Sequence, residues 1–201
     1  MEPPRRSPDP NTCLEANGSR IMIDCGLFQG LKELRLLNWS DLPFPAESIQ
    51  SILLTHAHLD HAGYLPRLVK NGFECPVYST PATGKLTQLI LADSARIQME
   101  DARHANRNGY PKHSPAPPLY DTIATNQTIR QLRIRDLDAW FEPAPGIPAH
   151  FHDAGCLLGS SAVEIHVDGE HRLSACSFPA MSGATMLPCI SIHRHRQIVT
   201  F

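Results

Sequence analysis

The amino-acid sequence predicts an α/β fold, because short apolar runs alternate with longer segments of helical periodicity. The apolar runs are closed by polar or turn residues and indicate strands; they cover residues 21–23, 51–55 and 75–79. Apolar residues at helical spacing indicate helices; these segments cover residues 63–69, 83–106 and 123–132. Three later apolar segments are expected to form a second sheet, at residues 139–142, 150–152 and 162–167.

The first of these strands ends at Asp24 and Gly26. Asp24 is predicted to orient the loop after the next strand by accepting backbone hydrogen bonds. The alternative is an ordinary turn residue at a strand end. The stretch from Leu27 to Leu37 mixes polar and apolar residues and is expected to be a loop with one helical turn.

The first helix, at residues 63–69, is indicated by Leu65 and Leu68 and is expected to end at Asn71-Gly72. The longest helical pattern covers residues 83–106, and its apolar face is expected to pack in the core. That face is formed by Leu86, Leu89, Ile90 and Ile97. Residues 108–118 are rich in glycine and proline, which predicts a linker; the alternative is an edge of a substrate groove.

Four potential metal ligands stand within six residues, directly after the strand at residues 51–55. They are His56, His58, Asp60 and His61. Imidazole nitrogen and carboxylate oxygen both suit zinc, and catalytic zinc keeps one position open for water. Open α/β sheets place their sites at the carboxyl ends of strands. A metal centre is therefore predicted here, in preference to a structural cluster of histidines.

The run His-Ala-His-Leu-Asp-His resembles the signature loop of the metallo-β-lactamase fold. Residues 19–26 resemble the strand that precedes this loop in the family. Residues 27–30, 63–68 and 151–155 resemble the β-CASP branch of RNA-processing nucleases, which is related to the cleavage and polyadenylation nuclease. The resemblance covers residues 13–169. It implies an αββα sandwich, incomplete here because the family's first strand and its C-terminal part are missing.

The resemblance also implies a cofactor and a reaction. One or two Zn²⁺ ions would support hydrolysis of an RNA phosphodiester, so RNA is the expected partner. His56 and His58 would hold the first zinc, with Cys156 where the family has histidine. Asp60 and His61 would face the second zinc. The catalytic residues would be His56, His58 and Asp60, and Asp60 could also take a proton from the nucleophile.

The position of Cys156 departs from the family. Thiolate is a competent zinc ligand, so the first zinc site could survive the change. The alternative is a small buried apolar residue, a common environment for free cysteine. The residues themselves leave both interpretations open.

A second departure concerns the family's Ser-Gly-Asp turn, whose aspartate bridges the two metals. No aspartate follows Asp168 in this chain. We hypothesise a reading-frame slip near Ser174 or Ala175, because the codons for residues 178–184 permit Ser-Gly-Asp-Val-Gly-Arg in an alternate frame. Sequencing the DNA tests this idea, which fails if the alternate frame lacks that hexapeptide.

Three segments are expected on these grounds. Residues 1–11 form a disordered or non-native leader, since their prolines cannot donate to a sheet. Residues 12–173 form a partial metallo-β-lactamase domain. Residues 174–201 form a divergent tail, which would be frame-shifted under the hypothesis above. The family's last metal-binding histidine and second domain would lie beyond the bridging aspartate.

Composition and charge bear on nucleic-acid binding, secretion and membrane insertion. The net charge of −2 gives no general attraction to nucleic acid, so RNA binding rests on the resemblance. The six cysteines include no Cys-x-x-Cys pair and no secretory signal is visible, which favours a reducing cytoplasm. No apolar run approaches the roughly 18 residues of a membrane span.

The remaining histidines are assigned peripheral roles. His150 and His152 are expected to lie near the site or on the surface, with rescue of the missing ligand as the alternative. Four further histidines have no visible constellation and are expected to be solvated: His166, His171, His193 and His195.

Three functions therefore compete. The first is a zinc-dependent hydrolase of the RNA nuclease type, and the second is an inactive zinc-binding fragment of such an enzyme. The third is a glyoxalase-like thiolester hydrolase, against which the β-CASP-like flanks argue. Apolar surface left where absent strands would pack predicts poor solubility, a homo-oligomer or a covering partner.

Overall fold

The computed structural model describes residues 11–108, 117–155, 157–167, 171–175, 190–192 and 198–200, with side chains for the first three of these ranges. Residues 1–10 of the leader expected at 1–11 lie outside the described residues, whereas Asn11 is described and buried. Cys156, most of the tail at 174–201 and most of the linker expected at 108–118 also lie outside the described residues. The strands are β1 (Thr12–Ala16), β2 (Ser19–Ile23), β3 (Ser51–Leu53), β4 (Val77–Ser79), β5 (Leu132–Ile134), β6 (Trp140–Ala144), β7 (Ile147–Asp153), β8 (Ser161–Val167), β9 (His171–Ala175), β10 (Ile190–Ile192) and β11 (Ile198–Thr200). The helices are α1 (Lys32–Leu37), α2 (Leu59–Ala62), α3 (Leu65–Lys70), α4 (Pro81–Asn108) and α5 (Thr122–Gln131), with a 3₁₀ turn at Ala46–Ser48.

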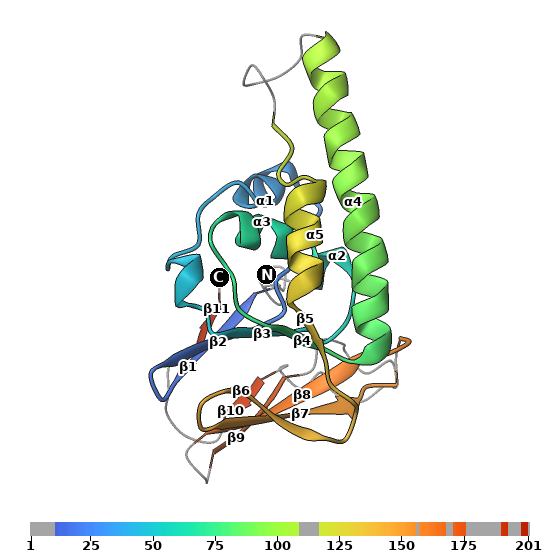
Figure 1. Cartoon of the computed structure of the whole chain (residues 1–201). Coiled ribbons are helices and arrows are strands. Elements are labelled where there is room, and N and C mark those ends of the chain that lie inside the picture. The colour runs from blue at the N-terminus through green and yellow to red at the C-terminus, as the bar shows by residue number, and fades with distance from the viewer. Residues whose placement is uncertain are drawn as a thin grey trace, which may run out of the picture.

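Two sheets and a layer of helices make up the described fold. The first sheet has the order β11-β1-β2-β3-β4-β5, and β2 to β5 run parallel. The second sheet, β10-β9-β8-β7-β6, is antiparallel throughout. The helices cover one side of the first sheet and the second sheet covers the other (Figure 1). This confirms the α/β prediction and gives three layers of an αββα sandwich.

Each side of the first sheet buries its own apolar cluster. Between the two sheets, Leu14, Ile21 and Leu53 pack against Phe151 and Ile165. On the helical side the core is formed by Met22, Ile49, Ile52, Leu54, Leu65, Leu68, Phe73, Val77 and Leu91. Because successive strand residues face opposite ways, β2 and β3 contribute to both clusters. The first sheet is therefore a rigid support for the loops at its carboxyl edge.

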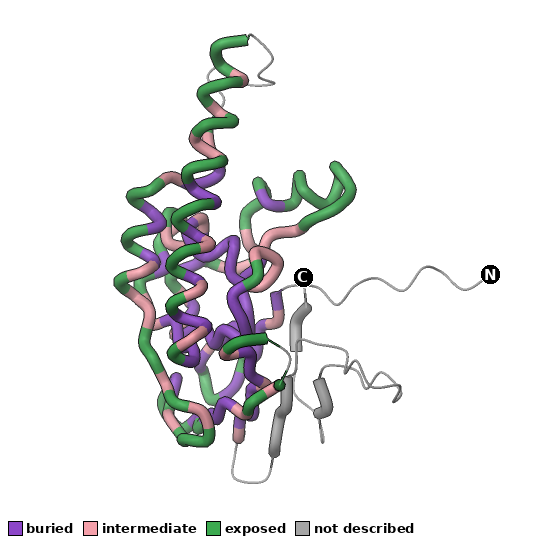
Figure 2. The backbone as a smooth tube through the Cα atoms, turned by 90° about the vertical axis from the view of Figure 1, so that its right-hand side faces the viewer, coloured by how far each residue is buried: buried purple, intermediate pink, exposed green. Residues whose placement is uncertain are grey.

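The predicted apolar face of α4 is wrong. The structure instead buries one leucine, Leu91, on a face that otherwise consists of small and polar residues: Thr83, Gly84, Thr87, Ser94 and Ala95. Leu89 is 69% exposed and Ile97 is 44% exposed. A Cβ at Gly84 would lie 2.6 Å from the Ile134 side chain, so close helix–sheet approach selects small residues. Beyond Ala95 no residue of α4 is buried, and the helix projects from the body (Figure 2).

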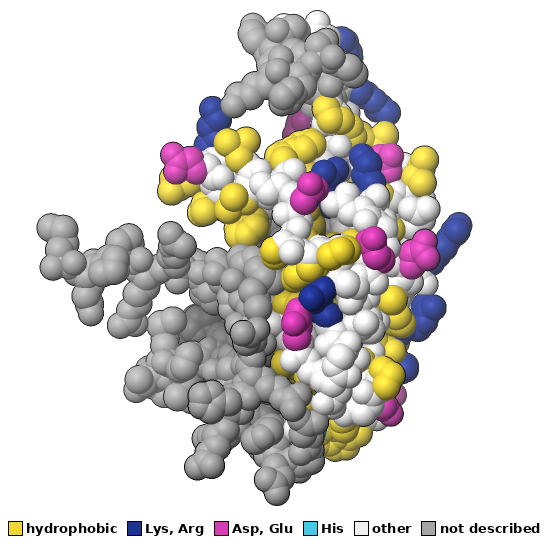
Figure 3. All heavy atoms as spheres, turned by 90° about the vertical axis from the view of Figure 1, so that its left-hand side faces the viewer, with side chains coloured by type: hydrophobic (Ala, Val, Ile, Leu, Met, Phe, Trp, Pro, Cys, Tyr) yellow, Lys and Arg dark blue, Asp and Glu magenta, His cyan; other side chains and the backbone are white. Residues whose placement is uncertain are grey.

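Apolar side chains are exposed around α1, which buries none of its own residues. Hydrophobic atoms gather over this segment in Figure 3. The exposed residues there are Leu31, Leu34, Leu36, Leu37 and Trp39. A homo-oligomer or another partner that covers exposed apolar surface stays a prediction. No helix in the described part of the chain is long and apolar enough to cross a membrane.

Candidate metal centre

The four predicted ligands lie at the carboxyl end of β3 and in the short helix α2 that follows. His56 is 2% exposed, and His58 is the exposed residue that caps α2. Asp60 and His61 occupy the helix itself. The histidine rings approach one another, with 4.7 Å between the centroids of His56 and His58 and 4.0 Å between His56 and His61. One turn of chain therefore gathers three imidazoles.

Asp24 anchors this loop from the end of β2, the parallel neighbour of β3. Its backbone has φ of 61°, a left-handed conformation that aspartate tolerates better than most residues. The carboxylate is buried and accepts the Thr55 backbone N–H at 2.8 Å through Oδ1. Its Oδ2 lies 2.7 Å from the Thr55 hydroxyl and 2.8 Å from His61 Nδ1. Asp24 thus makes the backbone contact expected of a residue that orients the loop.

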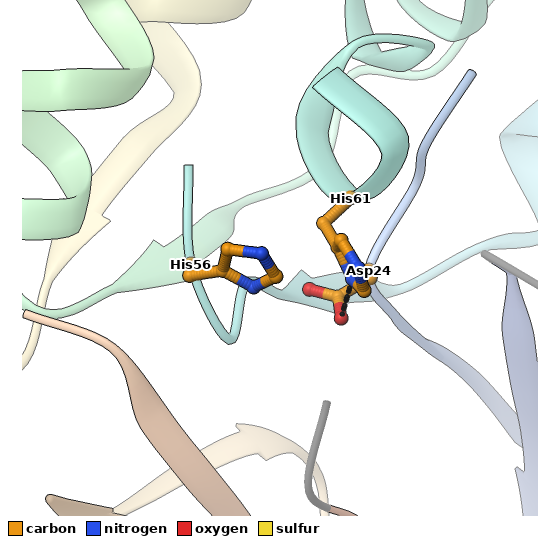
Figure 4. A group of neighbouring side chains, drawn as sticks. All are labelled: Asp24, His56 and His61. Atoms are coloured by element: carbon orange, nitrogen blue, oxygen red, sulfur yellow. Dashed lines mark hydrogen bonds and ion pairs between the residues drawn. The ribbon is translucent and has the colours of Figure 1, made fainter. Parts of the chain in front are cut away.

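These hydrogen bonds fix which nitrogen of each imidazole carries the proton. An ionised carboxylate only accepts, so the Thr55 hydroxyl and His61 Nδ1 both donate to Asp24. The Thr55 oxygen, 3.0 Å from His56 Nδ1, then accepts from that nitrogen. Both rings consequently carry their lone pair on Nε2, the form that binds a metal. Figure 4 shows the Asp24–His61 contact with His56 facing it.

The surroundings shift the two histidines in opposite directions. Burial, with the nearby His61, lowers the pKa of His56 to about 4, so this ring is neutral at pH 7. Burial also acts to lower the pKa of His61. The hydrogen bond and charge of Asp24, together with the charge of Asp60, outweigh it and raise the pKa of His61. A cation at the site would replace the proton that His61 otherwise attracts.

Backbone contacts hold α2 against the turn that follows β2. Cys25 N donates to His61 O at 2.6 Å, and Leu27 N donates to Leu59 O at 2.9 Å. Between them, a Cβ on Gly26 would lie 1.7 Å from the carbonyl oxygen of Asp60. Only glycine permits this approach. The histidine loop therefore packs directly against the backbone of the Asp-Cys-Gly run, residues 24–26.

A loop from the second sheet is fastened to the same edge. Ser161 N donates to Thr55 O at 2.9 Å. The hydroxyls of Thr80 and Thr83 donate to Gly159 O at 2.6 and 2.7 Å. Gly159 has φ of +78° and no room for a side chain. Residues 157–160 are thus held beside the histidine loop, whereas Cys156 lies outside the described residues.

The predicted ligands are only partly gathered into one group. Asp24, His56 and His61 each offer a ligand atom within 4.8 Å of the others. Asp60 Oδ2 lies 3.8 Å from His61 Nε2, and its side chain is half exposed. Imidazoles whose Nδ1 is engaged in a hydrogen bond, which leaves Nε2 for a metal, are with nearby carboxylates a donor set that fits zinc. Thr55, whose hydroxyl links Asp24 to His56, is a participant that the ligand pattern did not reveal.

His150 and His152 lie away from this site. In β7 the alternate residues Ile147, Ala149 and Phe151 enter the core, so the two histidines point to the opposite, outer face of the second sheet. The expectation that His166 has no constellation is wrong, because its Nε2 lies 2.7 Å from Glu164 Oε1 on the same face. His171, His193 and His195 lie outside the described side chains.

Comparison with known proteins places the chain in a family. The metallo-beta-lactamase superfamily model matches residues 12–162. The chain therefore belongs to the metallo-β-lactamase superfamily, as its signature loop predicted. Among solved structures, a mutant of the HARLDQ-motif metallo-beta-lactamase of Cronobacter sakazakii is 18% identical, with a TM-score of 0.51. The match covers 88% of this chain and 59% of that one, and it supports the fold alone.

The sequence relatives have names connected with RNA. Ribonuclease TTHA0252 of Thermus thermophilus is 32% identical over 156 residues, which is 78% of this chain and 32% of the relative. Transcription termination factor FttA of Methanosarcina mazei is 34% identical over 158 residues, which is 77% of this chain and 23% of the relative. The match thus spans about a third of the length of the first relative and just under a quarter of the second.

Proposed function

We propose that this chain carries the zinc centre of a hydrolase that cleaves RNA phosphodiester bonds, in the manner of the β-CASP nucleases it resembles. The observation that supports a metal centre best is the hydrogen-bond chain from Asp24 to His61 and, through Thr55, to His56. The proposal of RNA as the substrate rests on the names of the relatives.

Each residue of the loop has a role in this proposal. His56 and His58 would hold the first zinc with Cys156, and Asp60 and His61 would face the second. Bound zinc supplies a Lewis acid and lowers the pKa of water to about 7. Asp60, half exposed at the rim, accepts the proton that the nucleophile loses. Asp24 keeps the imidazole lone pairs directed to the metal and is not itself a ligand.

A second candidate is a domain that binds zinc without hydrolysis. It is favoured by one sequence observation, the lack of any aspartate after Asp168 to bridge two metals. Under this alternative residues 12–173 remain a metallo-β-lactamase domain, while residues 174–201 contribute no ligand. The divergent tail and the frame slip near Ser174 are part of the same proposal.

One experiment separates the two candidates. The purified chain is loaded with zinc, and both the zinc content and the cleavage of a fluorescent RNA are measured. The double variant His56→Ala/His58→Ala is the test, and His104→Ala on exposed α4 is the matched control. Zinc-dependent cleavage that the double variant loses supports the hydrolase. Zinc that the double variant loses, in a parent chain that shows no cleavage, supports the second candidate. Zinc content unaffected by the double variant contradicts both.

A further inference from the structure

The outer face of the second sheet carries a second group of histidines and carboxylates. In β8, Val163, Ile165 and Val167 enter the core, which leaves Glu164 and His166 on the outer face. His150 of β7 is directly paired with Glu164. Asp138, just before β6, completes the group. The outer-sheet cluster is therefore Asp138, His150, His152, Glu164 and His166.

Glu164 is the centre of this cluster. Its side chain is only 8% exposed, although it faces outward from the sheet. Oε2 lies 2.7 Å from His152 Nε2 and Oε1 lies 2.7 Å from His166 Nε2. Because a carboxylate only accepts, both Nε2 atoms carry protons. The lone pair of neutral His152 is then on Nδ1, turned away from Glu164.

His152 lies between the other ring and both carboxylates of the cluster. His152 Nε2 faces the oxygen of Glu164 and, at 2.9 Å, Nδ1 of His150, but it has one proton for both. On the other side of the ring, His152 Nδ1 lies 3.9 Å from Asp138 Oδ1. Among the described side chains, the free Nδ1 of His152 thus lies beside the Asp138 carboxylate, with the His150 ring close by. A cation is what such a group attracts.

The spacing fits a metal ion. One ligand atom from each of Asp138, His150 and His152 lies within 4.8 Å of the other two. Ligands at zinc-like bond lengths of about 2.1 Å lie roughly 3.4 Å apart in a tetrahedral site, so a contraction of well under 2 Å closes the group. A metal-binding imidazole whose other nitrogen donates to a carboxylate, as His152 does to Glu164, is the usual supporting arrangement.

We propose that Asp138, His150 and His152 bind a divalent transition-metal ion of the zinc and nickel class, with Glu164 as the residue that orients His152. The ligand set of two imidazoles and one carboxylate suits these metals better than calcium or magnesium. The site lies on the opposite face of the second sheet from the histidine loop. It is independent of the proposed hydrolase, and either can fail without the other.

Trp140 provides a direct readout. Its ring lies 5.0 Å from that of His150 and 4.6 Å from that of His166. The chain has two tryptophans, so a Trp39→Phe background leaves Trp140 as the sole reporter. In this background Ni²⁺ is titrated while tryptophan fluorescence is followed, and Zn²⁺ is then added as a competitor. The proposal predicts saturable quenching that Zn²⁺ reverses.

Variants assign the quenching to the cluster. Asp138→Asn, at a side chain 77% exposed, should weaken Ni²⁺ binding at least about tenfold without affecting the fold. His150→Gln/His152→Gln should abolish saturation, whereas His104→Gln should change nothing. Quenching that never saturates, or that both cluster variants leave intact, would overturn the proposal. Loss of quenching in His56→Ala/His58→Ala, with the fold retained by circular dichroism, would overturn its independence from the histidine loop.

Discussion

The substitution Asp24→Asn isolates the role of the buried carboxylate in directing the histidines. An amide has one oxygen in place of two, and its NH₂ would face the Thr55 hydroxyl or His61 Nδ1, where Asp24 Oδ2 now accepts. His61 would then accept through Nδ1 and carry its proton on Nε2, the nitrogen needed for the metal. Asparagine tolerates the left-handed backbone of this position, so the change is mainly one of hydrogen bonding.

These contacts allow the expected changes in zinc affinity and in the free energy of unfolding to be estimated. Removing a partner that orients a metal ligand typically lowers affinity about 10- to 100-fold, which is about 1.4–2.8 kcal/mol. A buried donor left without an acceptor lowers the free energy of unfolding by about 1–3 kcal/mol. Chelator competition with Zn²⁺ measures the first quantity and urea unfolding of the zinc-free protein measures the second.

A matched control and a clear contrary outcome complete this test. Asp101→Asn, on the exposed side of α4, makes the same chemical change away from the site and should alter neither quantity. Zinc affinity within about twofold of the parent for Asp24→Asn, in a protein that still unfolds cooperatively, would refute the tautomer argument.

Three further predictions concern packing and pH. Gly26→Ala should lower the free energy of unfolding by more than about 3 kcal/mol in urea, because its Cβ would meet the Asp60 carbonyl at 1.7 Å; an unchanged midpoint would contradict the close contact. Zinc-free protein should lose stability as pH falls from 6.5 toward 4. The pKa of His56 is lowered in the folded state, so the unfolded chain binds the proton more readily. Thermal melts across pH measure this loss, and His56→Asn should flatten it. Leu91→Ala should cost about 2–5 kcal/mol and Leu89→Ala less than about 0.5 kcal/mol; equal costs would contradict the buried face of α4.

Local patterns in the sequence predicted the framework of the site well. The apolar run before His56 identified β3, and parallel packing of β2 beside it brought Asp24 to the same edge. Both are consequences of short-range periodicity and of where parallel strands end. The family resemblance supplied the identity of the loop, which composition and charge alone do not give.

What the sequence did not predict depends on contacts between distant segments. The buried face of α4 includes Gly84, which lies close to Ile134 of β5, so counting apolar residues selected the wrong side. The hydrogen bond from the Thr80 hydroxyl to Gly159 O joins residues that are 79 positions apart. The outer-sheet cluster depends on the register that pairs His150 with Glu164, which no local spacing encodes.

The measurement that tests the central claim most directly is the zinc content of a chain whose outer-sheet cluster has been removed. In a His150→Gln/His152→Gln background, native mass spectrometry of zinc-loaded protein should show at least one zinc per chain. Adding His56→Ala/His61→Ala should remove it while circular dichroism shows the fold retained. Zinc that persists after His56 and His61 are both removed would contradict the assignment of the metal centre to the end of β3.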